Sequence, residues 1–68
     1  MILTIIVNGE PRELTASSSV ADLIETLELN PRQVAVEVNL ELVPRALHAQ
    51  RELVDGDQLE IVTLAGGG

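Results

Sequence analysis

Few residues in this chain have side chains that could do chemistry. There is no cysteine and one histidine, His48. A catalytic nucleophile needs a neighbouring base, and a metal site needs several ligands. His48 has no second histidine with which to share a metal, the serines at 17–19 have no neighbouring base, and the Asp-Gly-Asp turn at 55–57 has too few ligands for a calcium loop. We therefore predict that the chain is not an enzyme by itself and holds no metal or cofactor.

The remaining reactive group is the C-terminal carboxylate. The chain ends in Ala-Gly-Gly-Gly at residues 65–68, and the carboxylate belongs to Gly68. Glycine lacks a Cβ and has the widest backbone range, so residues 65–68 are predicted to form a flexible tail that enters a narrow site on another protein. A carboxylate becomes reactive toward nucleophiles once it is joined to AMP from ATP. The alternative is that these glycines are frayed terminal residues or an expression scar.

Composition limits the class of protein. The chain has 68 residues, a net charge of −7, four arginines, no lysine and no aromatic residue. This length predicts one small domain. The negative charge repels phosphate backbones and no aromatic ring can stack on bases, which argues against nucleic-acid binding. The longest apolar run is too short to cross a membrane, and no signal-like segment is present. We expect a cytoplasmic protein that does not bind membranes.

The first half of the chain predicts a hairpin followed by a helix. Residues 2–7 are rich in β-branched side chains and predict a strand, Asn8-Gly9 predicts a tight turn, and residues 12–15 return as a second, antiparallel strand with Pro11 at its start. Ser19 is the predicted N-cap, with Asp22 three residues on. Apolar residues then recur with helical spacing as far as Leu27. The Asn-Pro pair at 30–31 is predicted to stop the helix.

The second half predicts strands separated by turns. The expected elements are a strand at 34–38, a short edge strand at 42–43 stopped by Pro44, a helical or 3₁₀ turn within 45–51, a turn at 55–57 and a last strand at 58–64. One amphipathic helix on a mixed sheet of four to five strands, in the order β-β-α-β-β-β, predicts an α+β β-grasp fold. The predicted domain is 1–64, followed by the tail at 65–68.

The strands also predict a face where a partner docks. If alternate residues of the first and last strands face the helix, the others form the open face of the sheet. These are Ile2, Thr4, Ile6, Val62 and Leu64. Because these two strands are adjacent in a β-grasp, we expect one exposed aliphatic patch that leads to the tail and forms a partner interface, with acidic Glu60 and Asp57 at its rim. The alternative is scattered surface aliphatics, which are ordinary.

Several segments of the chain resemble those of a known family, the ThiS family of sulfur carrier proteins. The matching segments are 7–10 (Val-Asn-Gly-Glu), the helix at 19–27, 36–39 (Val-Glu-Val-Asn), 43–45 (Val-Pro-Arg), 55–57 (Asp-Gly-Asp), 60–62 (Glu-Ile-Val) and the terminal glycines. No single segment is decisive, but their order and spacing before a Gly-Gly carboxylate are specific. The resemblance covers essentially the whole chain.

The resemblance implies a ubiquitin-like β-grasp carrier in thiamin biosynthesis. An E1-like adenylyltransferase of the ThiF type would use ATP to adenylate Gly68. Sulfur from a cysteine-derived persulfide would give a thiocarboxylate, which a thiazole synthase of the ThiG type would consume. Gly67 completes the family's terminal pair, and Gly66 is an additional glycine. We expect a free monomer that assembles only with its partners.

Other sulfur carriers remain as alternatives. The small subunit of molybdopterin synthase also ends in Gly-Gly, but that family typically has aromatic residues near its start and before the glycines. This chain has none and reads Val-Thr-Leu-Ala at 62–65. Carriers for cysteine synthesis or tRNA thiolation are also possible. A different class of function would be a plain interaction module or a ubiquitin-like modifier.

Overall fold

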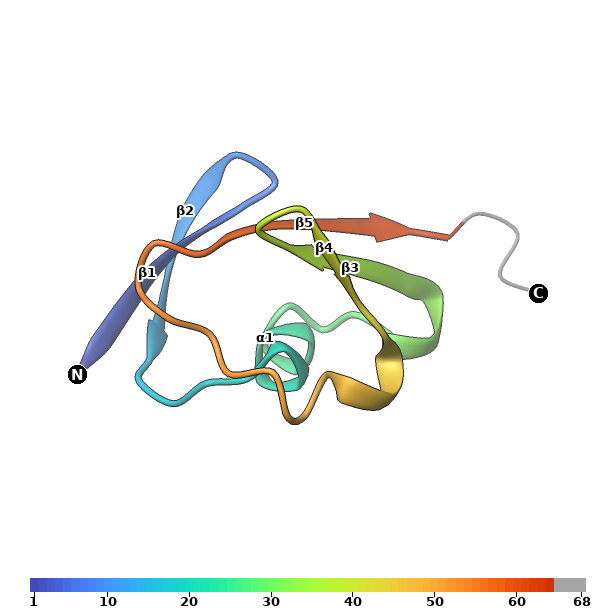
Figure 1. The fold of residues 1–68 in the computed structure, drawn as a ribbon, viewed down its shortest axis with the longest axis horizontal. Coiled ribbons are helices and arrows are strands. Elements are labelled where there is room, and N and C mark those ends of the chain that lie inside the picture. The colour runs from blue at the N-terminus through green and yellow to red at the C-terminus, as the bar shows by residue number, and fades with distance from the viewer. Residues whose placement is uncertain (65–68) are drawn as a thin grey trace.

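The computed structural model describes residues 1–64 as one mixed sheet with a single α-helix on one face (Figure 1). In chain order the elements are β1 (Ile2–Val7), β2 (Glu10–Thr15), α1 (Val20–Thr26), the 3₁₀ turn η1 (Pro31–Gln33), β3 (Val34–Val38), β4 (Glu41–Val43), the 3₁₀ turn η2 (Arg45–Leu47) and β5 (Gln58–Thr63). The sheet order is β2-β1-β5-β3-β4. Strands β1 and β5 are parallel, and the other neighbours are antiparallel. This arrangement confirms the predicted α+β β-grasp fold.

The first hairpin forms because Asn8 and Gly9 both accept a left-handed backbone. Their φ angles are 51° and 84°, the combination that a two-residue hairpin turn requires. Val7 therefore pairs directly with Glu10, and β2 begins two residues earlier than predicted. Pro11 lies within β2, which is an edge strand, where a missing N–H costs little.

Helix α1 begins where the sequence predicts. The Ser19 hydroxyl accepts a hydrogen bond from the Asp22 amide at 3.2 Å, and the Asp22 carboxylate accepts one from the Ser19 amide at 2.9 Å. This is the predicted capping box. The first two amides of the helix donate to the carbonyls of Arg51 and His48, at 3.0 Å each. The segment after η2 therefore completes the N-terminal cap, which the sequence did not reveal.

The helix ends earlier than the Asn-Pro pair at 30–31 predicts. It stops at Thr26, and Glu28 adopts a left-handed φ of 60°. The Leu29 amide then donates to the Ile24 carbonyl at 3.1 Å, which closes the last turn in a Schellman-type motif. Glycine is the usual residue at this left-handed position. Because Glu28 occupies it here, the sequence contains no ordinary signal for this end.

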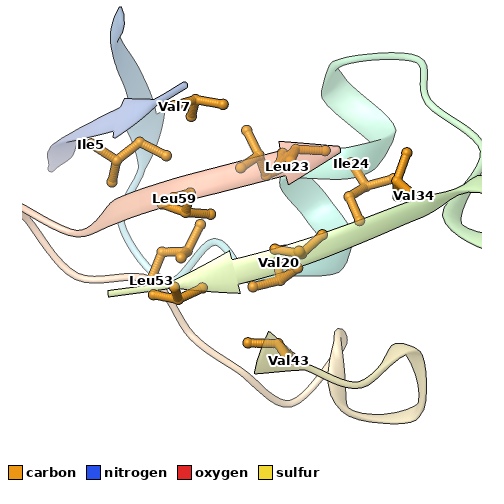
Figure 2. Packing of buried hydrophobic residues seen from close by; sticks show 12 residues of the cluster. Ile5, Val7, Val20, Leu23, Ile24, Val34, Val43, Leu53 and Leu59 are labelled. Atoms are coloured by element: carbon orange, nitrogen blue, oxygen red, sulfur yellow. The ribbon is translucent and has the colours of Figure 1, made fainter. Parts of the chain in front are cut away.

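The hydrophobic core lies between the sheet and α1, and its side chains come from both layers (Figure 2). Its buried members are Ile5, Val7, Val20, Leu23, Ile24, Val34, Val36, Val38, Val43, Leu53, Leu59 and Ile61. Alternate residues of β1 and β5 therefore face the helix, as predicted. Leu3 belongs to the same face, where it packs against the cluster and is partly buried. Aliphatic burial of this kind is the main stabilising term in a domain without aromatic side chains.

The capping box predicts a measurable loss of stability when its serine is removed. We expect Ser19→Ala to lower the free energy of unfolding by about 1 kcal/mol, because the Asp22 amide loses its partner at a buried helix end. Urea denaturation measures this change. Ser17→Ala is the matched control, since Ser17 is exposed and outside the cap. Equal stabilities of the two variants would contradict the capping role.

Candidate functional site

The candidate site is the end of β5, the strand that leads into the terminal glycines. This strand lies between β1 and β3. On the β3 side, Val62 lies opposite Ala35, and the Leu64 amide donates to the Gln33 carbonyl at 2.8 Å. The backbone is therefore held as far as Leu64. The predicted tail residues Gly66 and Gly67 and the predicted attachment site Gly68 lie outside the described residues.

On the other side of β5, the side chain of Asn8 continues the hydrogen bonding where β1 ends. Its amide nitrogen Nδ2 donates to the Ile61 carbonyl at 3.1 Å, and its oxygen Oδ1 accepts from the Ile61 amide at 2.9 Å. The Asn8 backbone amide donates to the Leu59 carbonyl at 2.9 Å. From the sequence, Asn8 was predicted only as a residue of the tight turn. Its second role had no local signal, because the partner lies 53 residues away.

The Asp-Gly-Asp turn at 55–57 sets the position of β5 relative to β1. The Asp55 carboxylate accepts from the Thr4 amide at 2.8 Å, and the Gly56 amide donates to the Thr4 carbonyl at 2.8 Å. Gly56 has a φ of 89°, which favours glycine. With the turn tied to β1 in this way, Ile6 pairs with Gln58.

Asp57 is not part of an acidic rim, contrary to the prediction. Its side chain is buried, with 3% exposure. One carboxylate oxygen accepts from Asn39 Nδ2 at 2.9 Å, and the other accepts from the Val54 amide at 2.8 Å and lies 3.9 Å from Arg51 Nη1. Buried charges persist when they are paired and hydrogen-bonded in this way, so Asp57 stabilises the turn. Glu60 is exposed, as a rim residue must be.

The predicted docking residues do not form one continuous patch. Ile2 is 66% exposed, Val62 57% and Leu64 48%, while Thr4 is exposed and Ile6 is half-buried. In the parallel register, Ile6 of β1 pairs with Gln58 of β5. Ile2 lies four residues before Ile6 and Val62 lies four residues after Gln58, so the two side chains lie in opposite directions along the sheet. At about 3.3 Å per residue, Ile2 and Val62 are roughly 25 Å apart along the sheet.

The start of β1 and the end of β5 accordingly lie at opposite ends of the molecule (Figure 1). The expectation of a single patch was wrong because it used strand adjacency without the register. Val62 and Leu64 are the aliphatic residues beside the tail, with Ala35 directly opposite Val62. Whether these residues contact a partner stays a prediction.

The other residues considered for chemistry have structural roles. His48 is buried, with its Nε2 3.1 Å from the Val43 carbonyl, as a packing histidine would be. The Ser18 hydroxyl donates to the Thr15 carbonyl at 2.7 Å. Within residues 1–64, no group of three or more His, Cys, Asp or Glu side chains could hold a metal ion. No helix in this range is long and apolar enough to cross a membrane.

Comparisons with known proteins agree with this geometry. The family model of the ThiS family matches residues 5–68. The chain is 30% identical to the sulfur carrier protein ThiS of Escherichia coli, over 97% of this chain and 100% of that protein. A crystal structure of the thiamine biosynthesis protein ThiS from Geobacter metallireducens superposes with a TM-score of 0.83 at 30% identity, covering 97% of this chain and 100% of that one.

A further relative is much longer. The chain is 47% identical over 66 residues to a thiazole synthase of Paramagnetospirillum magneticum, and this match covers 97% of the chain but only 20% of that protein. A shared fold, a family match over nearly the whole chain and a full-length similarity to a known carrier point to one assignment: the chain belongs to the ThiS family of ubiquitin-like sulfur carrier proteins.

Proposed function

We propose that this protein is the sulfur carrier of thiamin biosynthesis and that its Gly68 carboxylate carries the sulfur as a thiocarboxylate. The observation that carries this proposal is the family match, which extends to residue 68 and so includes the terminal glycines. The hydrogen bonds of Asn8 and Gln33 support it, because they hold β5 up to the residue before the tail. The chain then acts as a co-substrate, and its partners supply the catalysis.

The proposed chemistry begins with activation of Gly68. A ThiF-type adenylyltransferase joins the carboxylate to AMP from ATP and releases pyrophosphate. The terminal sulfur of a persulfide attacks the acyl carbon, and AMP leaves. The resulting acyl disulfide is cleaved by a thiol, which becomes oxidised to a disulfide and leaves the thiocarboxylate on Gly68. The partner's contacts offset the cost of ordering the glycines in its site.

The proposed acceptor of the sulfur is a ThiG-type thiazole synthase. The similarity to a segment of the Paramagnetospirillum magneticum thiazole synthase supports this choice, since that protein contains a region 47% identical to this chain. We place the carrier in the cytoplasm as a free monomer. Its net charge of −7 would steer it toward a basic partner surface.

Reconstitution tests the proposed function. The chain is incubated with a ThiF-type enzyme, ATP, a persulfide donor and a thiol, and its intact mass is followed. We expect a mass increase that matches the exchange of one oxygen for one sulfur at Gly68, followed by loss of that sulfur to thiazole synthase. Transfer to molybdopterin synthase instead would support a sister carrier. Isopeptide products would support a modifier, and no adenylation would support an interaction module.

The docking residues predict a graded effect on adenylation. We expect Leu64→Asp to raise KM for the carrier about tenfold, because a charge replaces an apolar side chain beside the tail. Ile6→Asp should raise KM less. Ile2→Asp is the matched comparison: it introduces the same charge on the same face, but roughly 25 Å from Val62. Steady-state adenylation kinetics measure all three variants. An unchanged KM for Leu64→Asp would remove the end of β5 from the interface.

A further inference from the structure

A groove lies on the helix side of the sheet, between α1, η1 and η2 with the residues after it. Its volume is about 520 Å³, which falls in the range of sites that hold a ligand. Most of the lining is small or aliphatic, with alanine, isoleucine, leucine and proline side chains. Four residues with charged or titratable side chains complete it, namely Glu25, Arg32, Arg45 and His48.

The arginines make this groove an exception on an acidic protein. The whole chain has four arginines against eleven acidic residues, and Arg32 and Arg45 both line the groove. Within residues 1–64 the one ion pair joins Arg51 to Asp57, so no carboxylate of the described residues lies within ion-pair distance of either groove arginine. Glu25 is the one acidic residue in the lining. Guanidinium groups bind carboxylates through two parallel hydrogen bonds.

His48 also lines the groove, and its side chain is buried. It is 4% exposed, and its Nε2 lies at hydrogen-bond distance, 3.1 Å, from the carbonyl oxygen of Val43. A carbonyl only accepts, so Nε2 is the donor in this contact. Among the described residues, Nδ1 is the only buried side-chain nitrogen or oxygen without a hydrogen-bond partner. Because Nδ1 is buried, it is closed to a ligand in this conformation, and the two arginines carry the recognition.

The groove lies close to the end of the molecule at which β5 ends. Arg32 precedes Gln33, whose carbonyl holds the Leu64 amide. An enzyme that engages Gly68 must approach this end and is therefore within reach of the groove. A negatively charged segment of that enzyme would be attracted to the two arginines of the groove and repelled by the acidic surface of the rest of the domain. This difference would fix the orientation in which the two proteins dock.

We propose that this groove binds an acidic peptide segment of the enzyme that adenylates the tail. A carboxylate of the segment pairs with Arg32 and Arg45, and an adjacent apolar side chain packs on the aliphatic lining. A peptide meets both requirements, whereas inorganic phosphate would leave the apolar lining unmatched. This inference rests on the proposed function, because it takes a tail-adenylating enzyme as the partner.

Charge reversal in the full chain tests the proposal. The double variant Arg32→Glu/Arg45→Glu should raise KM for adenylation at least about tenfold, with kcat unchanged, and Glu25→Gln should lower KM. Arg12→Glu is the matched control for a single reversal in the groove. Arg12 is exposed on β2, and its replacement by Glu changes the net charge by the same amount as Arg32→Glu or Arg45→Glu. If Arg12→Glu raises KM as much as Arg32→Glu alone, the groove has no specific role and the proposal is overturned.

A binding measurement separates this inference from the proposed function. The ¹⁵N-labelled chain is titrated with a blocked Leu-Glu-Leu tripeptide, which requires no turnover. We expect chemical-shift changes at the amides of Arg32 and residues 45–49, lost in the double variant. Equal changes with blocked Leu-Gln-Leu, or none with either peptide, would overturn the groove proposal. Wild-type chain that binds the acidic peptide but is never adenylated would overturn the proposed function alone.

Discussion

Deletion of Gly67 and Gly68 is expected to abolish thiocarboxylate formation while leaving the thermal unfolding of the domain unchanged. The carboxylate would move back to Gly66, about 7 Å along an extended chain, and would fall short of the catalytic groups of the adenylating enzyme. Misplacement on this scale removes most of the benefit of bound proximity. Stability should persist because the buried core consists of residues between Ile5 and Ile61. Intact-mass analysis measures the product, and a melting curve measures stability.

A second tail variant distinguishes the position of the carboxylate from the number of glycines. One alanine added after Gly68 keeps every glycine but moves the carboxylate outward and puts a Cβ beside it. We expect this variant to lose the reaction as well, again without a change in melting temperature. Normal thiocarboxylate formation by the deletion variant would remove Gly68 as the attachment site. A large loss of stability would show instead that the glycines support the fold.

Leu23→Ala is expected to have the largest effect on stability. Leu23 lies on α1 at the centre of the core, with 0% exposure (Figure 2). Removing a buried leucine side chain costs about 2–5 kcal/mol, from lost burial and from the cavity that remains. A domain of this size rarely has more than about 3–5 kcal/mol of stability, so the variant should lose about half or more of it. Urea denaturation followed by circular dichroism measures the loss.

Leu42→Ala is the matched control for this substitution. Leu42 is on edge strand β4 and is 64% exposed. The same atoms are removed, but few of them are buried, and surface substitutions usually change stability by less than about 0.5 kcal/mol. If the two variants lost equal stability, the packing of α1 on the sheet would not be the main source of stability in this fold.

Local patterns in the sequence predicted most of the fold. The strand at 34–38, the turn at Asn8 and the capping box of Ser19 each depend on residues close together in the chain, so the sequence alone carried their signals. The end of α1 was missed because Glu28 adopts a conformation that glycine usually signals. Asp57 was misassigned because its hydrogen-bond partner Asn39 lies 18 residues away.

The sequence by itself determined the chemistry available to this protein. With one histidine and no cysteine, the sequence offers few side chains for catalysis, and this led to the prediction that the Gly68 carboxylate is the reactive group. Only the tertiary structure decided which side chains lie together around the end of β5. The parallel register of β1 and β5 separated Ile2 from Val62, and packing of η1 and η2 beside α1 placed Arg32 and Arg45 in one groove. These arrangements depend on hydrogen bonds and contacts between distant segments, which leave no periodic signal in the sequence.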